Sequence, residues 1–417
     1  MRDRAPRHGC CCPAVAILSV TLTESFMSHL RPSLARSFRA AICAVSLPLA
    51  GACASHSAAS AASDSAASRA SQVAAPLPPV HHVFIIVLEN KNFDATFGKS
   101  SEAPYLADTL ARQGALLTQY YGVGHYSLDN YIAMTSGQAP NKQTQGDCGR
   151  FEDFVETGMA AHGQVAGQGC VFPAHVLNIA NQLEQKGLRW KGYMEDMGND
   201  PAREAATCGH PRIGDPDRTQ GAQKESAGHP LDQYATKHNP FMYFHSIIDA
   251  PSCDSNVVSF ATLESDLASA TPMANYVFIT PNLCSDGHDS HCASDRTGGL
   301  PAINEFLRAW VPRILASPSF KDGLLIITFD EAQAIDASAC CSEQPGPNSA
   351  RPGVIGPGGG RIGAVLLSPF IAPGTVSNVP YNHYSMLRSV EDLFGLTPHL
   401  GFAAPEELRT FGSDVFR

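Results

Sequence analysis

The most constraining feature of this sequence is a series of short, almost continuously apolar segments that alternate with helical patterns. The first, His82–Leu88, has the length and β-branched composition of a strand buried on both faces. Strands are also expected at residues 188–194, 274–280, 324–329 and 363–367, and helices at 105–114, 128–135, 176–186, 303–315 and 385–394. This alternation predicts an α/β fold with a mainly parallel central sheet and helices on both faces.

The 417 residues, 44% of them hydrophobic, are enough for one large α/β domain or two ordinary ones. We assign residues 78–417 to a single catalytic domain. Residues 140–255 are rich in Gly, Pro, Asp and His and predict a loop-rich insertion, and the Gly/Pro stretch 346–360 predicts a mobile surface loop. The net charge of −10 argues against a nucleic-acid partner, because such a protein normally presents a basic face.

Residues 1–53 have the features of a signal peptide, with Arg residues before an apolar run and small residues after it. The first 26 residues fit this layout poorly, which indicates Met27 as an alternative start. Residues 54–77 are mostly Ala and Ser and predict a disordered linker. Ala50, Gly51 and Ala52 form an ordinary cleavage site, but together with Cys53 they also resemble a lipobox. The protein is therefore expected to be exported, either periplasmic or secreted, or anchored to the outer membrane through lipidated Cys53.

Export changes how the cysteines are interpreted, because disulfides persist in oxidising compartments. Eight cysteines follow the signal region: Cys148, Cys170, Cys208, Cys253, Cys284, Cys292, Cys340 and Cys341. They predict up to four disulfides in the insertion and beyond it, with pairing left open. Cys340 and Cys341 are expected to have different partners, because a bond between neighbouring cysteines is strained.

Acidic and amide side chains follow three of the expected strands directly or within a short loop. Glu89 and Asn90 follow the first, Asp286 lies past the strand at 274–280, and Asp330 and Glu331 follow the strand at 324–329. Ligands of open α/β sheets bind outside the carboxyl ends of the strands. Any one of these residues is explained equally well as a helix cap or a turn former. Together they predict a divalent metal site with oxygen ligands.

Ser127 lies at the start of an expected helix, where free backbone N–H groups favour an anion such as phosphate. It is either the helix N-cap or a nucleophile that a metal or base activates. His125, two residues earlier, is in a position to face the same cleft. His288 in the sequence DGHD and His383 are further candidates for binding a phosphoryl oxygen or protonating a leaving group.

The residues around these positions resemble the bacterial and fungal phosphoesterase family of the alkaline-phosphatase superfamily, which contains acid phosphatases and bacterial phospholipases C. The matching segments are 88–94 (LENKNFD), 125–131 (HYSLDNY), 238–241 (HNPF), 281–282 (PN), 286–289 (DGHD), 328–331 (TFDE), and 383–385 (HYS) with Glu391. They occur in the family's order and span residues 83–395, so the resemblance is specific although each motif alone is weak.

The resemblance implies an alkaline-phosphatase-like fold and assigns roles to the candidate residues. The implied divalent-metal ligands are Glu89, Asn90, Ser127, Asp330 and Glu331. Ser127 would also be the nucleophile that forms a phosphoserine intermediate, and His125 and His288 would complete the catalytic group. Substrate-binding positions would be Asn130, Asp286 and His383. Glu331 departs from relatives that carry a second Asp, which makes it the least secure ligand.

The expected activity is hydrolysis of phosphate monoesters, lipid phosphates included, because the chain is short beside the phospholipases C. A phospholipase C acting on phosphodiesters is the alternative, since the same serine and metal serve both reactions. A non-catalytic exported binding protein is a third hypothesis, which needs only the fold and the disulfides.

Overall fold

The computed structural model describes residues 76–269, 271–341 and 343–417. The described residues all belong to one compact unit, which lies within Ser71–Arg417. The predicted signal peptide, Cys53 and nearly all of the predicted linker therefore lie outside the described residues. Within the described part of the chain, no helix is both long enough and apolar enough to cross a membrane.

This unit is built on an eight-stranded sheet with the order β11-β2-β10-β9-β1-β8-β6-β7. Its strands are β1 (His82–Leu88), β2 (Ala115–Leu117), β6 (Trp190–Met194), β7 (Val257–Ser259), β8 (Tyr276–Thr280), β9 (Gly323–Phe329), β10 (Ala364–Leu367) and β11 (Thr375–Ser377). Only β10 pairs antiparallel with its neighbours, β9 and β2; every other pairing in the sheet is parallel. The predicted mainly parallel sheet is confirmed.

The centre of the sheet explains the apolar segments of the sequence. In β1, Val83 to Leu88 are each at most 1% exposed, because β8 and β9 flank the strand and helices cover both faces. Ile85 pairs with Phe278 on one side and with Ile326 on the other. A parallel strand in this position needs an apolar residue at every position. The strands β2, β7 and β11, which were not predicted, are only three residues long and lie toward the edges of the sheet.

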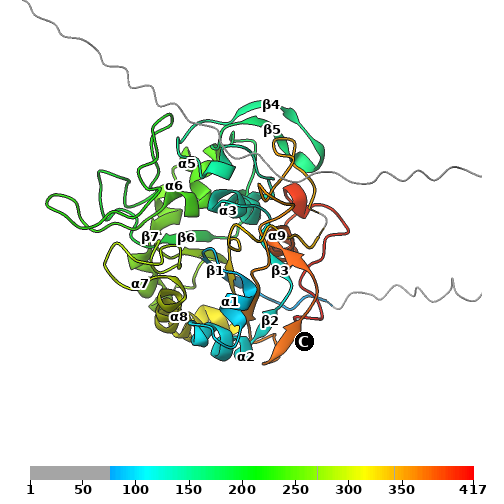
Figure 1. Ribbon diagram of the computed structural model, residues 1–417. Helices are drawn as coiled ribbons and strands as arrows, with labels where there is room; N and C mark the ends of the chain where they lie inside the picture. The colour runs from blue at the N-terminus through cyan, green and yellow to red at the C-terminus, as the bar shows by residue number, and fades with distance from the viewer. Residues whose placement is uncertain (1–75, 270, 342) are drawn as a thin grey trace, which may run out of the picture. The chain divides into compact units, whose positions relative to one another are not determined.

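Helices lie on both sides of the sheet, with α3 and α9 on one side and α1, α2 and α8 on the other (Figure 1). The helices are α1 (Phe93–Phe97), α2 (Ala111–Gln113), α3 (Ser127–Ser136), α4 (Ile179–Gln185), α5 (His245–Ile248), α6 (Cys253–Asn256), α7 (Leu263–Ala268), α8 (Gly299–Ala316) and α9 (His383–Phe394). A π-helix, η1 (Tyr105–Leu110), precedes α2, and short 3-10 helices are η2 (Thr144–Gly146), η3 (Ala161–Gly163), η4 (Thr236–His238), η5 (Pro240–Tyr243), η6 (Phe260–Thr262), η7 (Pro318–Asp322) and η8 (Gly401–Ala403). The five helices expected from the sequence are all present, with ends shifted by a few residues.

The predicted loop-rich insertion is also confirmed. Between α3 and β8 it contains short helices, the strand β6, the edge strand β7, and a separate hairpin of β4 (Val155–Met159) and β5 (Val165–Gln168). A further two-stranded ladder joins β3 (Tyr120–Tyr121) to β12 (Tyr381–Asn382). Residues 346–360 contain no helix or strand, as expected, but Pro352, Gly353 and Gly359 in this loop are buried.

Four disulfides link the eight cysteines: Cys148–Cys170, Cys208–Cys253, Cys284–Cys292 and Cys340–Cys341. The expectation that Cys340 and Cys341 have different partners was wrong. The other six cysteines are already paired within and just after the insertion, which leaves the two neighbours to bond to each other.

Candidate active site

The predicted acids converge at the carboxyl ends of three adjacent strands. Glu89 and Asn90 follow β1, Asp330 and Glu331 follow β9, and Asp286 lies in the loop after β8. Because β1 pairs in parallel with both β8 and β9, these ends meet at one edge of the sheet. The backbone N–H of Asn90 donates to Asp330 Oδ1 at 3.0 Å, and that of Glu89 donates to the Asp286 carbonyl at 2.9 Å.

Ser127 is the first residue of α3, and its hydroxyl points at this acidic group. Its Oγ donates to Glu89 Oε2 at 2.9 Å. The cap position belongs to Tyr126, whose φ of 81° lies in the left-handed region that bulky residues rarely adopt. Ser127 is therefore not the helix N-cap, and its hydroxyl remains directed at the site.

The loop before Ser127 is held in shape by Asn130. The Asn130 side chain accepts from the N–H groups of Val123 and Gly124 and donates to the carbonyls of Gly124 and Tyr126. Its amide is thus committed to the loop, and the structure does not place it in the cavity as the expected substrate contact. Gly359 packs so closely that a Cβ there would lie 2.2 Å from the Gly124 oxygen, which explains a glycine at this position.

Glu89 is the centre of the buried hydrogen-bond network. Besides Ser127, it accepts from Tyr131 OH at 2.6 Å, and His238 Nε2 lies 3.4 Å from Oε1. On its other side, His238 Nδ1 lies 3.1 Å from Asp286 Oδ2, and its ring stacks on Tyr131. His238 belongs to the HNPF motif that was matched from the sequence, but no role was predicted for it. Asp286, expected to bind substrate, instead lies behind Glu89 and His238.

Burial and mutual repulsion make this group of acids electrostatically costly. Burial raises the pKa of Glu89, and the charges of Asp330 and Asp286 raise it further. Burial likewise raises the pKa values of Asp286 and Asp330. Asp330 Oδ2 and His238 Nε2 are buried, and neither has a hydrogen-bond partner among the described residues. Such a group fits a bound cation, which would relieve the repulsion and occupy the unpartnered atoms.

Two overlapping sets of residues could hold that cation. Glu89, His238 and Asp286 offer ligand atoms that all lie within 4.8 Å of one another. The set expected from the sequence shares Glu89 and adds the buried Asp330 together with three residues that line the cavity: Asn90, Ser127 and Glu331.

Glu331 is turned toward His125, with which it forms a close contact between Oε2 and Nδ1. The N–H of Tyr126 also donates to Glu331 Oε2 at 3.2 Å. Burial raises the pKa of Glu331 to about 7, although the bond to His125 opposes the shift. The second nitrogen of His125 lies 3.0 Å from the Asp336 carbonyl. His125 and Glu331 therefore form a pair at the cavity wall, and their catalytic and ligand roles remain predictions.

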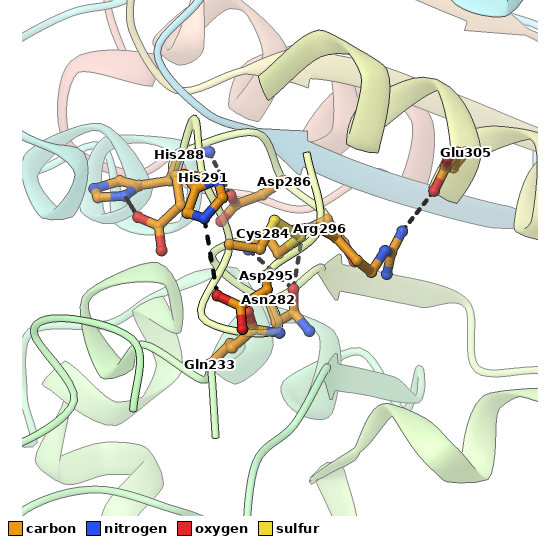
Figure 2. The surroundings of a disulfide bond; sticks show 12 residues. Gln233, Asn282, Cys284, Asp286, His288, His291, Asp295, Arg296 and Glu305 are labelled. Atoms are coloured by element: carbon orange, nitrogen blue, oxygen red, sulfur yellow. Dashed lines mark hydrogen bonds and ion pairs between the residues drawn. A yellow bond between two sulfur atoms is a disulfide. The ribbon is translucent and has the colours of Figure 1, made fainter. Parts of the chain in front are cut away.

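His288 reaches the cavity from the loop after β8. The Cys284–Cys292 disulfide closes this loop, and Figure 2 shows Asp286 and His288 close together beside it. His288 Nδ1 lies 2.8 Å from Asp289 Oδ1, which leaves Nε2 facing the cavity.

His383 is buried beneath the acids rather than beside a substrate. Its Nε2 lies 2.5 Å from the Asp330 carbonyl, and its Nδ1 lies 3.2 Å from Tyr120 OH. Burial lowers the pKa of His383 to about 4, so the ring is neutral. Both nitrogens are used within the protein and His383 does not line the cavity, while its expected role in substrate binding stays a prediction.

Ser127, Glu331, His125 and His288 border an open cavity of about 420 Å³. Its walls are formed by Asn90, His125, Tyr126, Ser127, Asp147, Lys237, His288, Glu331, Ala334, Gly353, Val354 and Ile355. Asp147 and Lys237 were not predicted. Lys237 directly precedes the HNPF motif, which was the one available signal, whereas nothing in the sequence around Asp147 indicated a site.

A serine at a helix N-terminus, directed at carboxylates beyond the ends of parallel strands, is an arrangement that suits the binding and transfer of a phosphoryl group. Comparison with protein families agrees, because residues 99–397 match the Phosphoesterase family. The chain belongs to the Phosphoesterase family.

Several curated proteins are similar to this chain. It is 27% identical to a probable acid phosphatase of Kluyveromyces lactis over 76% of this chain and 59% of the relative. It is 26% identical to a phosphate-repressible acid phosphatase of Penicillium chrysogenum, over 79% of this chain and 64% of that protein. A phosphatidylinositol-3-phosphatase of Mycobacterium tuberculosis is 26% identical over 79% of this chain and 82% of its own length. The chain thus spans less than two thirds of the two acid phosphatases.

Among solved structures, a protein of the alkaline phosphatase superfamily from Vibrio parahaemolyticus is similar at 13% identity and a TM-score of 0.43, over 78% of this chain and 69% of that one.

Proposed function

We propose that this protein is an exported acid phosphatase that hydrolyses phosphate monoesters through a phosphoserine intermediate. The observation that carries the proposal is the 2.9 Å hydrogen bond from Ser127 Oγ to Glu89 at the start of α3, beside an open cavity. The similarity to acid phosphatases of Kluyveromyces lactis and Penicillium chrysogenum supports the same reaction class.

A divalent metal ion fits the acidic group. We propose that Glu89, Asn90, Ser127 and Asp330 hold it, with Glu331 as the least secure ligand because its side chain is already bonded to His125. When bound, such an ion lowers the pKa of a serine hydroxyl and neutralises charge that develops on the phosphoryl oxygens.

The chain's own residues then account for the remaining requirements. Ser127 Oγ gives its proton to Glu89 Oε2, which accepts its hydrogen bond, and attacks phosphorus, so that a new bond to Ser127 forms while the bond to the leaving alcohol breaks. The positive dipole end of α3 lies at Ser127, where it favours the negatively charged phosphoryl group. His288, whose Nε2 faces the cavity, is placed to protonate the leaving oxygen. Water then hydrolyses the phosphoserine and releases inorganic phosphate.

Export is part of the proposal. Four disulfides favour an oxidising compartment, and the predicted signal peptide agrees with that location. Periplasmic or secreted release and anchoring through lipidated Cys53 remain alternatives.

Lipid phosphates are a second candidate substrate class, because the mouth of the cavity is apolar. Tyr126, Val354 and Ile355 border the cavity with exposed fractions of 47%, 42% and 63%, and Ile335, next to the cavity-wall residue Ala334, is 88% exposed. Exposed apolar patches of this kind mark binding surfaces. The similarity to the Mycobacterium tuberculosis phosphatidylinositol-3-phosphatase points the same way.

A direct assay distinguishes the alternatives. The mature protein is assayed with a phosphate monoester and with a phosphocholine diester, each with and without chelator. Monoester turnover that Ser127→Ala abolishes and Ser136→Ala preserves supports the proposal. Ser136 is the matched control because it lies in the same helix with its hydroxyl bonded to the Ile132 carbonyl. A preference for the diester favours the phospholipase C alternative, and turnover of neither ester favours a binding protein.

A further inference from the structure

One buried cation at the cavity has no part in the function proposed so far. Lys237 lies in η4 and is only 5% exposed, yet its side chain borders the cavity with Ser127 and His288. It is the one Lys or Arg among the described residues that form the cavity walls. A buried ammonium is costly unless it is paired, so its position needs an explanation.

Asp147 fixes where this ammonium lies. Lys237 Nζ is 3.0 Å from Asp147 Oδ2, and the other oxygen, Oδ1, accepts the N–H of Leu128 at 3.1 Å. One carboxylate thus joins Lys237 to the first turn of α3, directly after Ser127. The charges of Asp147 and Glu89 keep the pKa of Lys237 above its ordinary value although burial opposes the shift, so Lys237 is cationic.

The ammonium is placed to contact a bound phosphoryl group. Besides Asp147, its neighbour is His288 Nε2 at 3.4 Å, and His288 faces the same cavity. One of its three N–H groups is thereby directed at Asp147, and both Lys237 and His288 border the cavity.

The charge of the substrate decides what such a cation does. A phosphate monoester carries nearly two negative charges at neutral pH, because its second pKa is about 6. A phosphodiester carries one and has one fewer non-bridging oxygen. A cation held in place attracts the dianion more strongly and offers a donor to the oxygen that the diester lacks.

We propose that Lys237, positioned by Asp147, is a substrate-binding residue that selects the dianionic terminal phosphate of a monoester over the phosphate of a diester. This inference rests on the proposed phosphoesterase function and names the residue that sets its preference.

Binding and turnover together test the inference. The main variant is Lys237→Met with Asp147→Asn, because Lys237→Met alone would leave a bare carboxylate that itself repels phosphate. Binding of inorganic phosphate and of dimethyl phosphate is measured by calorimetry near pH 8, and kcat/KM is measured for 4-nitrophenyl phosphate and bis(4-nitrophenyl) phosphate. We expect phosphate binding and monoester turnover to fall by roughly 10²-fold, the usual effect of removing one donor to a developing or bound oxyanion. Dimethyl phosphate binding and diester turnover should change by less than about threefold, since a monoanion gains less from the cation.

Three further variants separate charge from structure. Lys237→Arg keeps the cation and should keep the preference for the dianion. Lys237→Gln keeps a donor for Asp147 without the charge, and should lose the preference even where the double variant does not fold. Lys191→Met removes a lysine that does not line the cavity and whose Nζ is ion-paired with Asp266 Oδ2 at a distance of 2.7 Å. This variant should change neither measurement.

Wild-type phosphate affinity in both the double variant and Lys237→Gln would overturn the inference, and would mean that Lys237 only neutralises Asp147. Equal losses for the two anions would overturn it as well. Failure of the proposed function is distinguishable, because a wild-type protein that hydrolyses neither ester would still report the anion preference by calorimetry.

Discussion

The phenol of Tyr131 donates a 2.6 Å hydrogen bond to Glu89 on the carboxylate oxygen opposite the one that accepts the Ser127 hydroxyl. The two bonds orient Glu89 from both sides, and Tyr131 lies one turn after Ser127 in the same helix. Orienting bonds of this kind are expected around a metal ligand or catalytic carboxylate.

Tyr131→Phe should therefore lower kcat/KM for a phosphate monoester by roughly 10-fold, because a hydrogen bond to a charged group contributes about 1.5–3 kcal/mol. The fold should persist, since Phe fills nearly the same buried volume. Tyr276→Phe is the control, because Tyr276 is also buried but its hydroxyl has no hydrogen-bond partner among the described residues. Equal activities of the two variants would contradict an orienting role for Tyr131.

Metal removal should destabilise the protein as well as inactivate it. An ion that binds only the folded state stabilises it, by about 2.7 kcal/mol at a concentration 100 times its Kd. Chelator should lower the thermal midpoint by a few degrees, and re-addition of Mg²⁺, Mn²⁺, Ca²⁺ or Zn²⁺ in turn should identify the ion that restores it. Asp330→Asn should abolish this shift, whereas Asp266→Asn, which changes an acid paired with Lys191, should not. A shift that survives Asp330→Asn would place the ion elsewhere.

The sequence predicted the acids well because a local pattern determines their place. Glu89 and Asp330 each follow an apolar strand, and parallel pairing of β1 with β9 brings strand ends together whatever the details of packing. The helix that begins at Ser127 was also predicted from a local pattern, the spacing of its apolar residues. Element type and strand direction were sufficient for these residues.

Side-chain directions and the packing of loops could not be predicted from the sequence. His383 could not be identified as a buried partner of the Asp330 carbonyl, because its ring direction depends on how α9 packs against α3. Asp147 comes from an aperiodic loop whose position is fixed by the Cys148–Cys170 disulfide and by contacts far along the chain. Lys237 precedes a recognised motif, yet only the folded chain brings it to Asp147.

The apolar mouth of the cavity provides a test of the substrate class. Ile355→Ser should reduce kcat/KM for a phosphate monoester with a long acyl or alkyl chain by roughly 5- to 10-fold, because burying an aliphatic side chain against the substrate contributes about 1–2 kcal/mol. Turnover of 4-nitrophenyl phosphate should stay within about twofold. Val376→Ser removes a comparably exposed residue on β11 and should affect neither substrate. Equal effects of Ile355→Ser on both substrates would argue against a lipid phosphate.

Glu391 provides a prediction for the pH dependence of stability. It is fully buried in α9, where its Oε1 accepts the N–H of Leu400 at 2.9 Å and its Oε2 has no partner. Burial raises its pKa from an ordinary value of 4.5 to about 8, although the bond from Leu400 opposes the shift. The folded state therefore holds this proton to a higher pH than the unfolded state does.

The sign follows from linkage: where the folded state binds more protons, the free energy of unfolding falls as pH rises. The contribution of Glu391 is fully present below about pH 4.5 and is lost between that value and about pH 8. Each pKa unit corresponds to about 1.4 kcal/mol, so the loss is several kcal/mol at most. Glu391→Gln stays neutral and can still accept from Leu400, so it should raise the thermal midpoint at pH 8 and leave it nearly unchanged at pH 4.5. Differential scanning calorimetry across this range measures the effect, and a stability difference that does not grow with pH would show that Glu391 is not the group that titrates.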